Sequence, residues 1–483
     1  MYNLGEQFNV DYSSALANPE NVFQGNKYRF TLLTERLIRL EYNEFGNFSD
    51  EPTLLVLNRN FPKVECKVKQ DKNYLEITTS YFKLFYSKDK KFTNKNLKVQ
   101  ILNTDKVWVY KHVEAKNYPA SQVLENDKVK NIKSLYSLDG FVSIDDSKTK
   151  IFTQTGTTLD SNKMIDTYLF VYLNSFELCL KDYFALTGSP ALIPRYALGN
   201  WWSRNNNYND EQLKDLVDNF DKHNIPLSII LLDKDWHLKV SNTTLKTGFT
   251  FNKDNFKAPY EMISYLHNKG IRLGLSINPV EGIYSIDDYY EKATMYLKSD
   301  ENGVIPYNVL DPKWVDVYLK LFIHPLDALG VDFYFLDCQN EFLLNHYQFN
   351  DMARNYKRRS MLLGYNNEIA AHRYSILYAG KSKVSWESLK MIPLYNANAT
   401  NIGVTWYSHD VGGYFKGIED SELYIRYVQL ATFSPILKFG ADSGKYYKRE
   451  PWRWNIKTLG IVRDYLQLRH KLIPYLYCKK QLN

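Results

Sequence analysis

The sequence predicts an α/β protein in which an N-terminal antiparallel β-sandwich precedes a (β/α)₈ TIM barrel. Residues 1–190 show strand-like alternation and no long stretch with a 3.6-residue period. From about Pro194 onward, short apolar runs alternate with amphipathic segments over the rest of the 483 residues. Because a (β/α)₈ barrel takes about 250 residues, residues 191–483 are long enough to form one.

Four segments of the N-terminal region mix β-branched and aromatic residues with polar ones. They are Tyr28–Tyr42, Tyr74–Tyr86, Val99–Tyr110 and Ile165–Tyr172. Turns rich in Lys, Asn and Asp separate them, as is typical of antiparallel strands. We therefore expect residues 1–190 to form a β-sandwich domain.

The second region contains eight strand candidates, several of which are nearly continuous apolar runs, typical of buried parallel strands. They are Ala197–Trp202, Leu227–Leu232, Ile271–Ile277, Val331–Leu336, Ser360–Tyr365, Ser375–Ala379, Ile402–Tyr407 and Ser434–Phe439. An open doubly wound sheet is the alternative. The absence of a glycine-rich first turn weighs against the nucleotide-binding forms of that fold, so we expect a barrel over residues 191–483.

Amphipathic helices are predicted between these strands. Asn209 can cap the first one, with Gln212 three residues later completing a capping box, and the apolar face is formed by Leu213, Leu216, Val217 and Phe220. The other predicted helices are Tyr260–Lys269, Ser285–Leu297, Pro312–Leu329, Asn340–Lys357, Ser385–Ala397, Ser421–Thr432 and Trp454–Tyr477.

Composition excludes several classes of protein. The net charge of +7 comes from 61 basic and 54 acidic residues without a long basic block, so no nucleic-acid partner is expected. The four cysteines form no CxxC pair and the nine histidines no HExxH motif, so neither a disulfide scaffold nor a metal site is expected.

The N-terminus does not resemble a signal peptide, and no apolar stretch reaches about 18 residues. We expect a cytoplasmic protein without a membrane span or a cofactor, and the sequence does not give its oligomeric state.

Function in a barrel lies at the carboxyl ends of its strands. Asp233 and Asp235 follow the second candidate strand, Asp337 follows the fourth and Asp410 follows the seventh. A single aspartate there can be a helix N-cap, but four at three strand ends favour chemistry. Carboxylates accompanied by tryptophans suit a carbohydrate site, because indole faces pack on the C–H surfaces of sugars.

Six collinear segments resemble glycoside hydrolase family 31, which contains α-glucosidases and α-xylosidases. They are Tyr196–Arg204 (YALGNWWSR), Ile225–His237 (IPLSIILLDKDWH), Gly330–Asp337 (GVDFYFLD), Val384–Leu389 (VSWESL), Trp406–Tyr414 (WYSHDVGGY) and Arg449–Trp452 (REPW). Upstream, Gly140–Ser147 and Leu186–Tyr196 resemble the family's N-terminal domain and its entry into the barrel. The resemblance implies the same sandwich and barrel. It also implies one or two C-terminal β-domains, which we expect to be absent from this chain.

The resemblance further implies a retaining α-glycosidase that acts on O-glycosyl bonds of α-linked sugars. In such enzymes a carboxylate attacks the anomeric carbon while a carboxylic acid protonates the leaving oxygen. The family's nucleophile corresponds to Asp337, and its sugar-binding aspartates correspond to Asp233 and Asp410. Trp202 and Trp236 would line the site. The expected partner is a small carbohydrate.

Three positions depart from the family pattern. Relatives have approximately HRYPVGFSGDT before VSWESL, and their acid/base aspartate falls on Lys381. A substrate-binding arginine falls on Tyr365, and a histidine falls on Gly440. An ordinary lysine is protonated at pH 7 with a pKa of about 10.4, so it matches the acid's role poorly. Lys381 is either an acid whose pKa burial has lowered or a static partner of Asp337.

Three functional hypotheses follow from the sequence. The first is a working α-glycosidase with an unusual acid, whose hydrolysis is weak. The second is a non-catalytic carbohydrate-binding or interaction pseudoenzyme. The third is a decaying gene product. The replaced positions favour weak or absent hydrolysis, because general acid catalysis contributes about 10²–10⁴-fold to the rate.

Overall fold

The computed structural model describes residues 13–112, 117–120, 123–125, 128–130, 133–153, 156–158, 165–240, 247–338, 341–356, 359–365, 369–374, 376–444 and 448–481. The chain divides into two compact units. The first comprises residues 1–120, 132–190 and 401–403, and the second comprises residues 121–131, 191–400 and 404–483. Ser375, the first residue of one predicted strand, and Asn340, the first residue of one predicted helix, lie outside the described residues.

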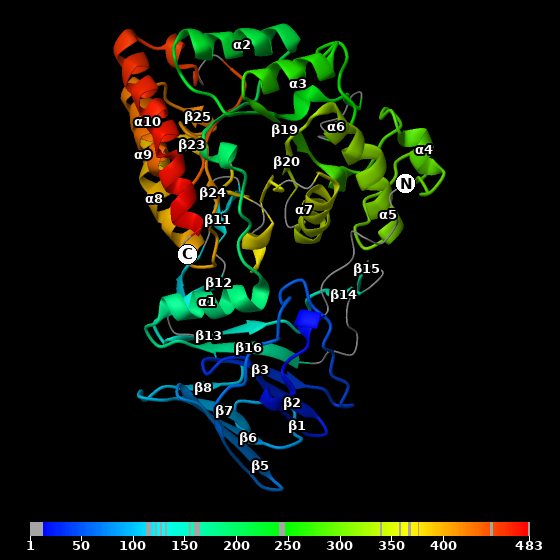
Figure 1. The fold of residues 1–483 in the computed structure, drawn as a ribbon, viewed down its shortest axis with the longest axis vertical. Helices are drawn as coiled ribbons and strands as arrows, with labels where there is room; N and C mark the ends of the chain where they lie inside the picture. Colours follow the sequence, from blue (N-terminus) through cyan, green and yellow to red (C-terminus); the bar gives the residue numbers. More distant parts are fainter. Residues whose placement is uncertain are drawn as a thin grey trace. The chain divides into compact units, whose positions relative to one another are not determined.

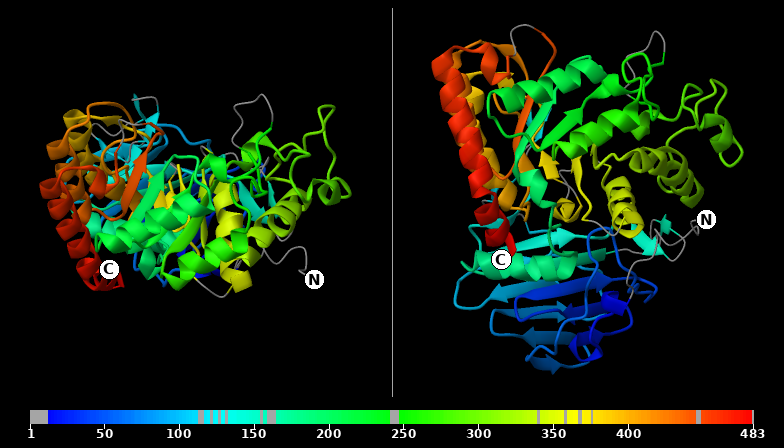
Figure 2. Two further views of the ribbon diagram at one scale, coloured as in Figure 1. Left: turned by 90° about the horizontal axis from the view of Figure 1, so that it is seen from above. Right: turned by 45° about the horizontal axis from the view of Figure 1, so that its top comes forward.

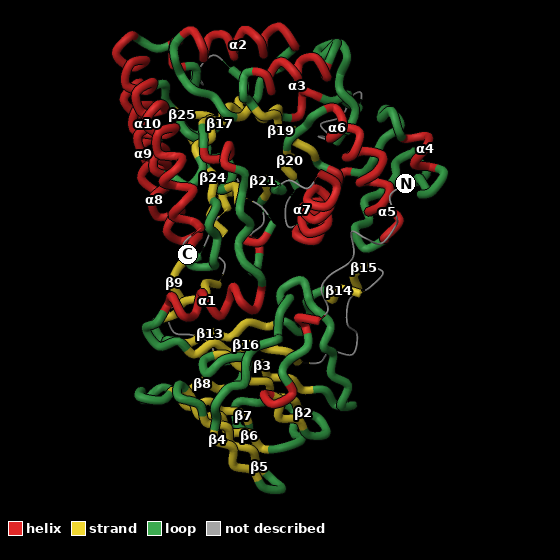
Figure 3. The backbone as a smooth tube through the Cα atoms, in the orientation of Figure 1, coloured by secondary structure: helices red, strands yellow, loops and turns green. Residues whose placement is uncertain are grey.

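The first unit is built on two five-stranded antiparallel sheets (Figure 3). One sheet has the order β1-β2-β3-β16-β13, with strands Val22–Gln24, Tyr28–Leu32, Leu37–Tyr42, Ile165–Val171 and Phe141–Asp145. The other runs β4-β5-β6-β7-β8, with strands Lys67–Gln70, Tyr74–Thr78, Phe82–Ser87, Leu97–Ile101 and Val107–Val109. Helix α1 (Phe176–Thr187) follows β16. Short pairs are formed by β9 (Asn117–Pro119) with β12 (Lys133–Ser137) and by β14 (Ile151–Thr153) with β15 (Gly156–Thr158).

Apolar side chains from both sheets share one core, as in a sandwich. Phe30 and Leu40 from one sheet and Ile77 and Val99 from the other are all fully buried in it. The pattern in the second sheet is the expected alternation, since β7 is buried at every second residue.

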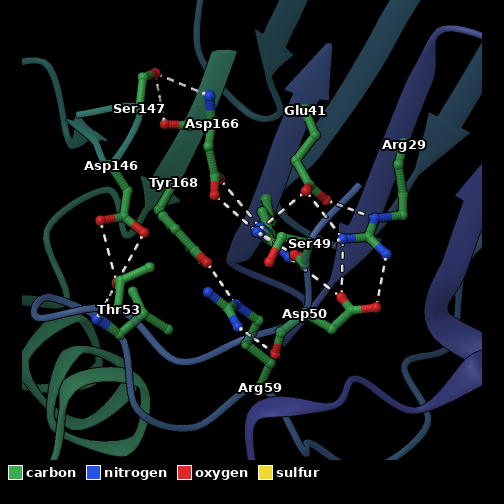
Figure 4. Close-up of polar contacts among 12 residues, drawn as sticks. Arg29, Glu41, Ser49, Asp50, Thr53, Arg59, Asp146, Ser147, Asp166 and Tyr168 are labelled. Atoms are coloured by element: carbon green, nitrogen blue, oxygen red, sulfur yellow. Dashed lines mark hydrogen bonds and ion pairs between the residues drawn. The ribbon is translucent and has the colours of Figure 1, made fainter. Parts of the chain in front are cut away.

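Buried ions tie the strands of the first sheet to neighbouring loops (Figure 4). Arg29 and Glu41 form an ion pair at 2.7 Å, and Arg39 pairs with Asp166 at 2.7 Å. Asp50 lies within 2.8 Å of Arg29. The four buried charges of Arg29, Glu41, Arg39 and Asp166 thus each face an opposite charge, which is the condition under which burial of an ion pair is tolerated.

The second unit contains the predicted barrel. Eight parallel strands follow the order β24-β22-β21-β20-β19-β18-β17-β26. Their bounds in chain order are β17 Asn200–Arg204, β18 Ile229–Leu232, β19 Arg272–Ile277, β20 Phe333–Leu336, β21 Leu362–Gly364, β22 Ile376–Tyr378, β24 Tyr407–Ser408 and β26 Leu437–Ala441. A parallel bridge between Asp410 and Lys438 nearly closes the sheet into a ring. Seven of the eight predicted strands lie within three residues of their expected bounds, whereas the strand expected over 402–407 is formed only by Tyr407–Ser408.

Helices surround this ring (Figures 1 and 2). Their bounds are α2 Asp210–Lys222, α3 Pro259–Asn268, α4 Tyr290–Thr294, α5 Pro312–Val317, α6 His324–Leu329, α7 Phe342–Tyr356, α8 Trp386–Thr400, α9 Ser421–Phe433 and α10 Ile456–Gln481. A short parallel pair is formed by β23 (Lys383–Val384) with β25 (Phe415–Gly417), and an antiparallel pair by β10 (Val123–Glu125) with β11 (Lys128–Lys130). The predicted capping box is confirmed, because Asn209 accepts from the Gln212 backbone and the Gln212 side chain accepts from the Asn209 backbone.

Two predicted helices are shorter or less regular than expected. Only Tyr290–Thr294 is helical within 285–297. The helix expected over 312–329 is interrupted by a π-helical segment, Tyr318–Ile323. Among the residues described above, no helix combines the length and apolarity that a membrane crossing requires.

Candidate active site

The candidate site lies at the carboxyl ends of the barrel strands. Asp233 directly follows β18, Asp337 directly follows β20, and Tyr365 directly follows β21. Lys381 comes three residues after β22, and Asp410 comes two residues after β24. Because the strands are parallel, all five positions belong to the same edge of the barrel.

Asp337 is held by a tyrosine. The Tyr365 hydroxyl lies within hydrogen-bonding reach of the Asp337 carboxylate. Burial, together with this carboxylate, holds the pKa of Tyr365 well above its ordinary value, so the phenol remains a donor. The Tyr365 ring packs against Phe335 of β20, with the ring centroids 5.5 Å apart, and against Tyr378 of β22 at 5.1 Å. The residue at the expected arginine position thus contacts the expected nucleophile.

Asp410 is engaged on both of its carboxylate oxygens. Lys438 of β26 donates to Oδ1, and the Tyr378 hydroxyl donates to Oδ2. The Lys438 ammonium also lies 4.5 Å from the centroid of the Tyr378 ring. Asp410 is 1% exposed, so this carboxylate belongs to the interior of the barrel.

The geometry of Asp410 explains the glycine at position 440. A β-carbon placed on Gly440 would lie 1.8 Å from Oδ1 of Asp410. No larger side chain fits while Asp410 faces Lys438. The glycine at position 440, where the family pattern has a histidine, therefore leaves the space in which Asp410 pairs with Lys438.

Asp233 and Lys381 meet through Tyr414. The Tyr414 hydroxyl donates to Oδ2 of Asp233 over 3.4 Å, and the Lys381 ammonium lies 4.4 Å from the centroid of the Tyr414 ring. Burial and, after it, the charges of Asp233, Asp410, Asp442 and Asp337 raise the pKa of Tyr414. Tyr414 therefore lies centrally among the site's carboxylates, although we did not predict it from the sequence.

The two predicted tryptophans pack into the barrel wall. The Trp202 indole donates to the Tyr208 hydroxyl over 2.9 Å, and its ring packs against Phe220 of α2. The Trp236 indole donates to the Ser276 carbonyl over 2.8 Å and packs against Phe251. Each is 1% exposed. The structure therefore does not bring either indole into the group of tyrosines and aspartates described above.

Two further carboxylates, those of Glu281 and Glu341, lie near Cys338, the residue that follows Asp337. Glu341 accepts a hydrogen bond from Tyr307, and Asn278 donates to Glu281 over 3.0 Å. Burial, followed by the charges of Glu341, Asp337 and Glu281, raises the pKa of the Cys338 thiol. The three carboxylates thus act on the same thiol, which stays protonated.

Segments of the sequence resemblance also hold one another together. Arg449, 3% exposed, donates to the carbonyls of Gly412 and Gly413, both over 2.8 Å. Arg204 pairs with Glu450. The REPW segment thereby fixes the loop after Asp410 and the end of β17.

Comparison with known proteins agrees with the fold. The family described as "Glycosyl hydrolases family 31 TIM-barrel domain" matches residues 190–360 and 344–479. An alpha-xylosidase of Saccharolobus solfataricus is 25% identical over 380 residues, covering 71% of this chain and 49% of the relative. Neutral alpha-glucosidase C of Mus musculus is 25% identical over 368 residues, covering 66% and 40% respectively. The chain spans half or less of the length of these relatives.

Solved structures with the same fold include a GH31 alpha-xylosidase from a soil metagenome complexed with xylose. It has a TM-score of 0.71 at 15% identity, covering 94% of this chain and 83% of that one. A GH31 dextranase of Flavobacterium johnsoniae complexed with glucose has a TM-score of 0.70 at 19% identity, covering 95% and 68%.

Proposed function

This chain belongs to glycosyl hydrolase family 31, and we propose that its barrel binds α-linked sugars at Asp337 and Asp233 and cleaves them only weakly, by a retaining mechanism. The observation that carries the proposal is the Asp337 carboxylate at the end of β20, oriented by the Tyr365 hydroxyl. In this mechanism Asp337 attacks the anomeric carbon, and water then hydrolyses the glycosyl-enzyme ester.

Weak cleavage is supported by the group at the acid position. A retaining enzyme of this kind needs a carboxylic acid to protonate the leaving oxygen as its bond to the anomeric carbon breaks. Lys381 occupies that position in the sequence pattern, and its ammonium lies over the Tyr414 ring. A lysine side chain carries no carboxylic acid, which is the group that this mechanism uses to protonate the leaving oxygen. The leaving group must therefore depart with little protonation.

The alternative is a non-catalytic carbohydrate-binding protein. Both oxygens of Asp410 are taken by Lys438 and Tyr378, and its carboxylate is buried. A sugar hydroxyl would have to displace one of these donors to reach it. This favours a site with fewer sugar contacts than the family pattern implies, and the experiment that follows separates the two candidates.

Leaving-group dependence tests the proposal. Aryl α-glucosides and α-xylosides with good leaving groups, such as 2,4-dinitrophenol, should be cleaved at least about 100-fold faster than those with phenol, because general acid catalysis is worth about 10²–10⁴-fold. Asp337→Asn should abolish this cleavage. Lys381→Asp should raise turnover of the phenyl glycosides by up to about 100-fold and change the dinitrophenyl rate little.

Two outcomes would count against the proposal. If no aryl α-glycoside is turned over, and Asp337→Asn matches the unaltered protein, the non-catalytic alternative is correct. If phenyl and dinitrophenyl glycosides have the same kcat/KM, which reports the step in which the leaving group departs, an acid is present at that step and the proposal is wrong. Thermal unfolding of each variant checks that its fold is intact.

A further inference from the structure

Lys381 is a half-buried cation at the carboxyl-end edge of the barrel. Its ammonium lies 4.4 Å from the centroid of the Tyr414 ring, and Tyr414 in turn donates to Asp233. Across the described ranges of the chain, no carboxylate lies within ion-pair distance of the Lys381 ammonium. The Lys381 ammonium therefore contacts the face of the Tyr414 ring, which accepts no conventional hydrogen bond.

Three other lysines that are buried or half-buried in the barrel unit are neutralised by a carboxylate. Lys320 pairs with Asp316 at 2.8 Å, and Lys448 pairs with Glu419 at 2.6 Å. Lys438, the more deeply buried lysine of the same site, pairs with Asp410. Lys381 differs from these three lysines in that its ammonium contacts a ring face in place of a carboxylate.

The ring contact keeps the ammonium in place without using its donors. A cation over an aromatic face is attracted by the ring's quadrupole, while a lysine ammonium carries three N–H donors. The Lys381 donors are thus available to a ligand that enters this end of the barrel. Aspartates 233 and 337 repel an anion on their own side, so an anionic group is favoured next to Lys381 over a position beside these carboxylates.

We propose that the site takes α-glycosides bearing an oxyanion, such as a carboxylate, sulfate or phosphate on the sugar, and that the Lys381 ammonium binds this group. The inference rests on the proposed function, because it assigns the substrate class of the same site. An oxygen of the anion would accept a hydrogen bond from the Lys381 ammonium, which makes this a charge-assisted hydrogen bond. The sugar itself would extend toward Asp233 and Asp337.

Isothermal calorimetry with matched sugars tests this inference. The probes are methyl α-glucoside, its 6-sulfate, its 6-phosphate and methyl α-glucuronide. We expect the anionic member that fits to bind about 10- to 100-fold more tightly than methyl α-glucoside, the range of one charge-assisted hydrogen bond. Comparison of the three anions identifies the oxyanion. The preference should weaken as salt is raised, because the contact is electrostatic.

Two lysine variants provide the matched comparison. Lys381→Met keeps a long apolar side chain over Tyr414 and should remove the anion preference. Lys383→Met alters an exposed lysine two residues away and should keep it. Equal affinity of the unaltered protein for neutral and anionic sugars would overturn the inference and leave the proposed function standing. The absence of saturable heat from any of these sugars, combined with no cleavage of aryl glycosides, would overturn both.

Discussion

At the scale of single residues, strand ends were predictable and side-chain directions were not. Asp233, Asp337 and Tyr365 follow their strands as expected, because an apolar run ends where polar residues begin. Trp202, however, faces α2 rather than the site. A parallel strand covered on both faces is apolar throughout, so its sequence does not reveal which residues point inward. A shift of one residue reverses every side chain.

The strand around Lys438 contains a sequence signal that could have predicted the ion pair with Asp410. It is a charged residue inside an apolar strand, LKFGA, all of whose residues are buried. Such a lysine requires a partner, and the SHD motif, which contains Asp410, offered one carboxylate for that role. Its role depends on the closure of the barrel between β24 and β26, which brings together residues 28 positions apart.

Removal of Lys438 should destabilise the barrel strongly. Lys438→Met leaves the Asp410 carboxylate buried with one hydrogen bond and no counter-charge. Breaking a buried ion pair in this way costs about 3–5 kcal/mol. The free energy of unfolding, measured by urea denaturation, should fall by that amount.

The double variant is the control for this prediction. Lys438→Met combined with Asp410→Asn removes both charges, so it should recover at least half of the loss. A double variant as unstable as Lys438→Met would show that packing around the lysine stem, and not the orphaned carboxylate, is responsible.

At the scale of helices and strands, regular apolar periodicity predicted the elements correctly, whereas local interruptions of a helix could not be predicted from it. The cap and apolar face of α2 are present as predicted. The helix expected over 312–329 is broken by Tyr318–Ile323 in π-helical form. Pro325 offers a physical reason, because proline lacks the N–H that an uninterrupted helix would use at that point. The pattern of apolar residues continues across such a break and therefore conceals it.

Arg469 anchors the last barrel helix, α10, to three other segments. It is fully buried and donates to the carbonyls of Leu198, Thr432, Ser434 and Pro435 over 2.6–3.0 Å. Burial lowers the pKa of its guanidinium to about 10. A planar guanidinium reaches all four acceptors at once, whereas an ammonium is a single point donor.

Arg469→Lys should therefore destabilise the protein even though it conserves charge. Loss of one or two charged hydrogen bonds, with their carbonyls left buried, costs about 2–4 kcal/mol. Chemical denaturation should show the loss. Arg463→Lys, a partly exposed position on the same helix, is the matched control and should change the free energy of unfolding by less than about 0.5 kcal/mol. Equal effects at the two positions would contradict an anchoring role for Arg469.

At the scale of the whole molecule, several titratable side chains are buried in states that couple stability to pH. Burial lowers the pKa of His409 to about 4 and that of His470 to about 4. Burial raises the pKa of Asp287 to about 6. Composition alone does not predict these shifts, because they arise from how deeply each group lies in the folded chain.

The buried histidines and Asp287 change the free energy of unfolding in opposite directions as the pH falls. A histidine whose folded pKa lies below its ordinary value of about 6.5 stabilises the fold above that value, and this stability is lost as the pH falls from 6.5 toward 4. Asp287 stabilises the fold below its ordinary pKa, and its contribution is lost as the pH rises through 6. Burial also lowers the pKa of His346 well below its ordinary value. Between pH 4 and 6 the unfolded chain therefore holds more protons than the folded chain at His346, His409 and His470, whereas the folded chain holds one more at Asp287. Stability should therefore fall as the solution is acidified.

The free energy of unfolding should be at least about 2 kcal/mol lower at pH 5 than at pH 7, since His409 and His470 each cost nearly 2 kcal/mol, Asp287 offsets a little more than 1 kcal/mol, and His346 adds to the loss. Urea denaturation across this range measures the difference. His470→Gln retains an acceptor for the Asn200 backbone N–H, which lies 3.1 Å from the imidazole, and should reduce the pH effect by nearly 2 kcal/mol. Asp287→Asn should enlarge it by about 1 kcal/mol, because only the histidines then respond. If both variants keep the original pH dependence, these buried groups do not govern the acid sensitivity of the fold.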